Sequence, residues 1–131
     1  MNDEEGTNAR FSPLPRRQAP KPSAHDEANI REELRRIRDR AEFVACSDRD
    51  DFVDGAASYD IASMVVIRLA SLTERSEFVR WAQTLSPDEI AAIRTIRNIA
   101  AHAGYAVMKD DLFWEAVTEL VPEIVERLLE Q

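Results

Sequence analysis

Three side chains that could act together on a phosphodiester lie between residues 96 and 105, where the sequence reads IRNIAAHAGY. If this stretch is helical, Asn98 and His102 share a face, and Arg97 lies one position before Asn98. Arginine binds phosphate through paired hydrogen bonds, and the unperturbed pKa of imidazole, about 6.5, suits proton transfer near neutrality. These types predict phosphodiester cleavage. The alternative is that His102 is a polar helix-end residue and Arg97 a solvated or ion-paired one, because a single triplet is weak evidence.

A helix over residues 86–103 is predicted to position these groups. Ser86 can cap its first turn, and Glu89, three residues later, completes a capping box. Gly104 supplies the left-handed residue that commonly ends a helix. His102 then lies in the last turn, where the helix dipole favours the protonated imidazole that a general acid requires.

A first long helix is predicted over about residues 26–46, because apolar residues recur there at steps of three and four. Its inward-facing residues are Ile30, Leu34, Ile37, Ala41 and Val44. Cys46 is the single cysteine, so an intramolecular disulfide and a cysteine-rich zinc site are excluded, and a cytoplasmic setting is expected. We expect Cys46 to be a small buried hydrophobe. The acidic stretch 47–54 predicts a short helical turn, since it lacks the glycine and glutamate spacing of a calcium loop.

A second helix is predicted over about residues 58–74, and a shorter helical piece follows to residue 85. Their expected core residues are Ile61, Met64, Val65, Leu69, Leu72, Phe78, Val79, Trp81, Ala82 and Leu85. After a turn over 107–111, a last helix is expected to start at Asp110 or Asp111. Proline inside a helix costs about 3 kcal/mol, so this helix should kink or restart at Pro122. The residues that complete the core are then Ile124, Val125, Leu128 and Leu129.

Composition supports an all-α fold. The chain has 131 residues, 44% hydrophobic and 32% charged, with only three glycines, which favours an antiparallel bundle of four or five helices. Residues 1–25 contain proline and arginine without periodicity and are expected to be a disordered tail, whereas 26–131 form the helical domain. No stretch approaches the roughly 18 consecutive apolar residues of a membrane span, so no membrane association is expected.

The net charge is −8, and residues 1–25 hold three acids and four bases, so the domain carries −9 by subtraction. Such a domain does not attract nucleic acid through a broad field. If RNA is the substrate, a local positive cleft must capture it. Within the motif helix, the basic residues that could form this cleft are Arg94 and Arg97. Alternatively, or in addition, the acidic surface faces a basic protein partner.

The segment IRTIRNIAAHAGY, followed by DD, FWEAV and VPEIVERL, resembles the HepT-like branch of the HEPN superfamily, helical toxins of two-gene toxin–antitoxin systems. The signature of that superfamily is an arginine, usually followed by asparagine, and a histidine a few residues later. Arg97, Asn98 and His102 match it with a four-residue gap. The resemblance is densest over 93–121 and extends back to about Glu32. In the HepT-like branch a tyrosine commonly stands two residues after the histidine, whereas Tyr105 here stands three after.

The resemblance implies a homodimer in which the motif helices of both subunits line one cleft. It further implies a metal-independent endoribonuclease toxin without a cofactor. The ribose 2′-hydroxyl would attack the adjacent phosphate, Arg97 would stabilise the phosphorane, His102 would exchange the proton and Asn98 would position the phosphate or the ring. Arg94 would support the site, and Glu74 would orient Arg97 or His102 unless it is only a surface residue.

The same resemblance implies a nucleotidyltransferase antitoxin that silences the toxin by attaching AMP to a tyrosine beside the histidine. Tyr105 is the candidate acceptor in this chain. It would overhang the cleft or, alternatively, pack against Phe113 and Trp114. The alternative function is a catalytically inactive dimeric helical module that binds RNA, nucleotide or a nucleotidyltransferase partner.

Overall fold

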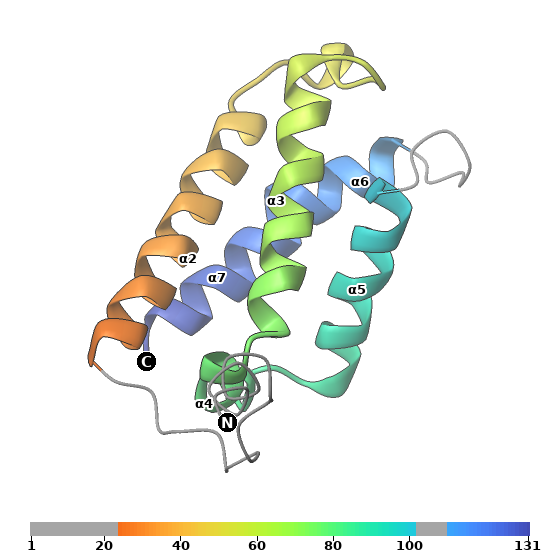
Figure 1. Cartoon of the computed structure of the whole chain (residues 1–131). Helices are drawn as coiled ribbons and strands as arrows, with labels where there is room; N and C mark the ends of the chain where they lie inside the picture. Colours follow the sequence, from red (N-terminus) through yellow and green to blue (C-terminus); the bar gives the residue numbers. More distant parts are fainter. Residues whose placement is uncertain (1–23, 102–109) are drawn as a thin grey trace, which may run out of the picture.

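The computed structural model describes residues 24–101 and 110–131, and all regular elements in these ranges are helical. The longer helices are α2 (Ala24–Ala45), α3 (Ala57–Thr73), α5 (Pro87–Ala101) and α7 (Val121–Leu129). The shorter elements are η1 (Arg49–Asp51), η2 (Ser76–Phe78), α4 (Val79–Ala82), α6 (Asp110–Glu115) and the π-helix η3 (Ala116–Leu120). Consecutive long helices alternate in direction (Figure 1). The predicted all-α bundle is therefore confirmed, whereas most of the predicted tail and of the 107–111 turn lies outside the described residues.

The core forms where α2 packs against α3 and α7. All five residues predicted to face inward from α2 are completely buried: Ile30, Leu34, Ile37, Ala41 and Val44. From the last helix, Ile124, Val125 and Leu128 are also buried, and Leu129 packs at the edge of the core. The three- and four-residue spacing in the sequence thus identified the faces along which these helices meet.

Three residues expected in the core are exposed instead. Met64 is 47% exposed and Val79 61% exposed. The inner face of α3 is defined by residues such as Val65 and Leu69, and Met64 lies about 100° away from Val65 around the helix. Val79 opens a helix of only four residues, whose buried side chain is Trp81. Cys46 is exposed because α2 ends at Ala45 and the chain turns outward there.

A kink or restart was predicted at Pro122, and the last helical stretch changes from π-helix to α-helix at Val121, one residue before it. Pro122 lies in the first turn of α7, directly after the π-helix η3. A proline in a continuous α-helix would collide with the carbonyl of residue 118, and a wider π-turn relieves such crowding. The Thr118 hydroxyl of η3 donates to the Trp114 carbonyl of α6 at 2.7 Å, a side-chain contact of the kind that often accompanies a helix bend.

An aromatic cluster joins the turn after η1 to α3 and α6. The Phe52 ring centroid lies 5.0 Å from that of Tyr59, 5.5 Å from that of Phe113 and 5.2 Å from that of Trp114. Burial raises the pKa of the Tyr59 phenol, and the carboxylate of Asp110 adds to the shift. The cluster brings together parts of the chain more than 50 residues apart, so sequence spacing did not reveal it.

The motif helix α5 begins with the predicted capping box. The Ser86 hydroxyl accepts from the Glu89 N–H at 3.1 Å, and the Glu89 carboxylate accepts from the Ser86 N–H at 2.9 Å. Arg127 of α7 also donates to both Glu89 carboxylate oxygens, at 3.0 and 2.6 Å. The Arg127 hydrogen bonds, reinforced by the Ser86 N–H, lower the pKa of Glu89 to about 2.

We expect Glu89→Ala to lower the free energy of unfolding at pH 7 by about 1–2 kcal/mol, because it removes a cap and a charge-assisted contact. A lowered carboxyl pKa stabilises the fold fully above its ordinary value of 4.5, and this contribution is lost as pH falls through about 2. Denaturant unfolding at pH 7, 4.5 and 2 measures the difference between wild type and variant, which should shrink towards pH 2. Asp88→Ala, an exposed acid in the same turn, is the matched control. An equal loss in both variants would contradict the role of Glu89.

Candidate active site

The helix α5 packs mainly on α3, and Ile93 is its one fully buried residue within 87–101. Ile90, Ile96 and Ala100 lie partly buried at the edge of the core. Because α5 turns one face to α3, residues 94, 97 and 98 project from its free side and its flank. The capping box at one end and this single packed face set the direction in which those side chains point.

Arg97 is the centre of a small polar cluster. Its Nε donates to the Asn98 Oδ1 at 2.9 Å, and its Nη2 donates to the Glu74 Oε2 at 3.2 Å. The Arg97 side chain is 25% exposed. The guanidinium is therefore held by two acceptors on different elements, and it still faces solvent along part of its edge.

Glu74 reaches the cluster from the end of α3, where it is the C-terminal capping residue. Its Oε2 also lies 3.9 Å from the Arg94 Nε, so one carboxylate oxygen stands between two guanidinium groups. The side chains of Glu74 and Arg94 are 43% and 52% exposed. At such exposure the ion pairs are weak and exchangeable, because water screens both charges.

This arrangement has the chemistry of an anion site. Two arginines and one glutamate leave one positive charge in a domain whose net charge is negative, and a carboxylate already occupies the position between the guanidinium groups. A phosphate has similar oxygen geometry and could replace it, with Arg97 donating in bidentate fashion. The amide of Asn98 would then be adjacent to the bound anion.

The structure brings together four of the six predicted site residues: Glu74, Arg94, Arg97 and Asn98. His102 directly follows Ala101, the last described residue of α5, and both His102 and Tyr105 lie outside the described residues. The contact between Arg97 and Glu74 joins positions 23 apart in sequence, so only the resemblance pointed to Glu74. The catalytic and supporting roles of these residues stay predictions.

Arg68, which lies on α3 about two turns before Glu74, does not join the cluster. Its Nε and Nη2 donate to the Glu33 carboxylate at 2.8 and 2.9 Å, which ties α3 to α2. The Arg68 hydrogen bond is the main reason why the pKa of Glu33 is lowered. Arg68 therefore has a structural partner, whereas Arg97 contacts only exposed acceptors.

Within 24–101 and 110–131, no three His, Cys, Asp or Glu side chains gather as metal ligands would. Over the same residues, every helix is too short or too polar to cross a bilayer. Comparisons of the chain with protein families, with curated proteins and with solved structures found no match.

Proposed function

We propose that this protein is a metal-independent endoribonuclease toxin of a two-gene toxin–antitoxin system, with Arg97, Asn98 and His102 as its catalytic residues. The observation that supports this most directly is the cluster around Arg97, where a half-exposed glutamate lies between two guanidinium groups. The arginine–asparagine–histidine spacing and the all-helical fold are consistent with the resemblance to HepT-like toxins.

The reaction needs only groups of the RNA and of the protein. The ribose 2′-hydroxyl loses its proton and attacks the adjacent phosphorus, the bond from phosphorus to the 5′-oxygen breaks, and that oxygen receives a proton. The products are a 2′,3′-cyclic phosphate and a 5′-hydroxyl. Arg97 stabilises the charge that grows on the non-bridging oxygens, Asn98 positions the phosphate, and His102 exchanges the proton.

In this proposal Glu74 holds the two arginines in the free protein and gives way to the phosphate when RNA binds. Before substrate binds, its carboxylate holds Arg97 and Arg94 in place, as groups around an active site commonly hold catalytic side chains. When RNA binds, the phosphate displaces Glu74 from the guanidinium groups. Because the Glu74 side chain is 43% exposed, it can move into solvent at small cost.

The active form is proposed to be a homodimer with both α5 helices lining one cleft. The domain carries −9 outside residues 1–25, so a second copy of Arg97 and Arg94 would supply positive charge that one subunit lacks. Ile99 on α5 is only half-buried, and a second subunit would cover it. The antitoxin partner is proposed to be a nucleotidyltransferase, with Tyr105 as the residue that receives AMP.

The test is cleavage of RNA by the purified chain in excess EDTA. We expect cleavage to persist, because no step requires a metal, and the new ends should be cyclic phosphate and 5′-hydroxyl. DNA of the same sequence is the matched control and should stay intact, since it lacks the attacking 2′-hydroxyl. Loss of cleavage in EDTA that Mg²⁺ restores would overturn the mechanism.

The second candidate is a catalytically inactive helical module that binds RNA, nucleotide or a nucleotidyltransferase. The acidic charge of the domain favours it, since a basic partner protein would bind such a surface. Expression of the chain alone separates the two candidates. The toxin proposal expects growth arrest with RNA cleavage, and the module expects neither.

A further inference from the structure

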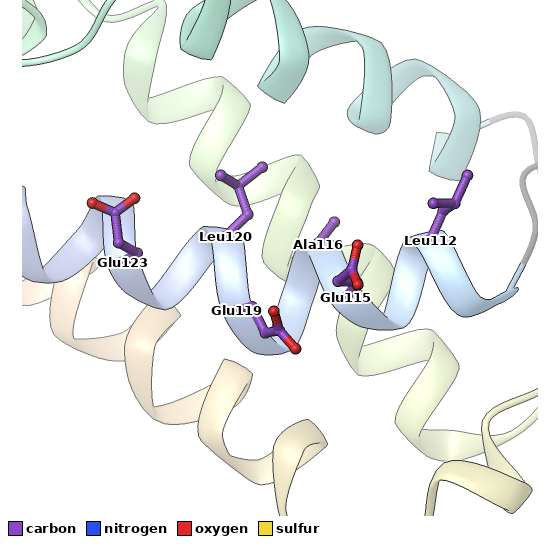
Figure 2. A pocket seen from close by; sticks show the side chains of 6 residues that line it. All are labelled: Leu112, Glu115, Ala116, Glu119, Leu120 and Glu123. Carbon is purple, nitrogen blue, oxygen red and sulfur yellow. The ribbon is translucent and has the colours of Figure 1, made fainter.

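A shallow groove runs along one side of α6, η3 and α7, and no residue of the Arg97 cluster lines it. Apolar residues and carboxylates follow one another there at four-residue steps (Figure 2). The lining residues are Leu112, Ala116 and Leu120, and Glu115, Glu119 and Glu123. The first three point to one side of the helical stretch, and Glu115 and Glu119 stand on an adjoining side.

The groove has an exposed apolar side chain and, among the described residues, two carboxylates without an ion pair. Leu112 is 59% exposed, which is unfavourable for a large apolar side chain. Glu123 is paired with Arg127 at 3.0 Å, but neither Glu115 nor Glu119 forms an ion pair within 24–101 and 110–131. Like charges four residues apart on a helix repel each other. A ligand with positive charges and an apolar side chain would reduce the repulsion between the carboxylates and cover Leu112.

We propose that this groove binds the basic segment of the same chain, residues 10–21 (RFSPLPRRQAPK). This segment has four basic residues and no acidic one, together with Phe11 and Leu14. Its three prolines favour an extended conformation, so it loses little entropy on binding. A segment that cannot bury its own apolar side chains can bury them against a groove. Leu14 or Phe11 covers Leu112 and Leu120, and the arginines pair with Glu115 and Glu119.

The distances permit this. Arg31 of α2 donates to the Leu129 carbonyl at 3.0 Å, so the start of α2 lies beside the end of α7 (Figure 1). At 1.5 Å per residue, Ala24 is about 10 Å along α2 from that contact, and Glu119 is about 15 Å along the last helical stretch from it. These two axial distances add to about 25 Å, and eight extended residues, from Ala24 back to Arg16, span about 26–29 Å. Arg16 therefore reaches the Glu119 carboxylate.

Limited trypsin digestion of the full chain tests the proposal through the cut after Arg17, followed by intact mass. We expect Glu115→Gln/Glu119→Gln to accelerate this cut roughly three- to tenfold over wild type, because two ion pairs that protect the segment are lost. Glu42→Gln/Asp60→Asn, which removes two exposed charges elsewhere, should cut at the wild-type rate. Equal rates in all three proteins would overturn the proposal.

Methyl NMR of the full chain provides a second, independent readout. The methyl signals of Leu112, Ala116 and Leu120 should shift between wild type and Arg16→Glu/Arg17→Glu, and those of Leu34 and Leu72 in the core should not. High salt should move the wild-type signals towards those of the variant, since the pairing is electrostatic. Groove signals that do not respond to the tail variant would refute the proposal. RNA cleavage is not used, so this result is independent of the proposed activity.

Discussion

Arg97→Gln is expected to lower the rate of RNA cleavage by about two to three decades, because a donor that stabilises transition-state charge contributes that much. Glutamine has similar length and keeps a hydrogen-bond donor for Glu74, but it has neither the positive charge nor the paired N–H groups of a guanidinium. The loss should be larger in kcat than in KM, since Arg97 contacts the bound phosphate but the charge on its oxygens grows during the reaction.

Single-turnover cleavage of a defined RNA measures this effect, and circular dichroism with native mass confirms helix content and assembly. Arg40→Gln is the matched control, because Arg40 is an exposed arginine of α2 whose hydrogen bond goes to the Arg36 carbonyl. That variant should cleave like the wild type. If Arg97→Gln lost its helical content, Arg97 would be a structural residue and the catalytic proposal would be wrong.

His102→Ala is expected to abolish growth arrest and to reduce cleavage by about two to four decades, the usual contribution of a general acid or base. The imidazole is the one group in the signature that can both accept and give a proton near neutral pH. The matched control is His25→Ala, which removes the other histidine of the chain from an exposed position at the start of α2. The control should remain toxic.

A pH profile distinguishes proton transfer from a structural effect of His102. The wild-type rate should depend on pH through the imidazole, and the residual rate of His102→Ala should lack that limb. The double variant Arg97→Gln/His102→Ala should lose far less than the product of the single losses, because residues that act as one unit are not additive. Wild-type toxicity in His102→Ala would instead show that His102 is not the group that transfers the proton.

Short-range features of the fold were predictable from the sequence, and long-range ones were not. Ser86 and Glu89 are three residues apart, so their capping box follows from local chemistry. Arg127 lies 38 residues from Glu89, and no spacing rule connects them. The apolar residues of α2, spaced three and four apart, correctly predicted its buried face. On α3, Met64 lies next to the buried face and is exposed. Periodicity locates a face to within about a quarter turn, which is too coarse for residues at its border.

In the candidate site, too, the local contact was predictable from the sequence and the long-range contact was not. Arg97 and Asn98 are neighbours whose contact is local, and residue type and spacing alone made them candidates for the site. Glu74 meets Arg97 only because the end of α3 packs beside α5. The groove with Glu115 and Glu119 was also not foreseen, since a row of glutamates in sequence resembles an ordinary solvated helix face.

The one-sided attachment of α5 has a consequence for local stability. Because Ile93 is its one buried residue in 87–101, we expect α5 to separate from α3, once its Glu89–Arg127 contact with α7 breaks, while α2, α3 and α7 keep their shared core. The free energy of such a partial opening is smaller than that of global unfolding, so the backbone amides of α5 would exchange with solvent through this sub-global state. Any molecule that binds across Arg97 and Glu74 clamps α5 to α3, and it would thereby make the opening of this helix rarer at sites far from its own contacts.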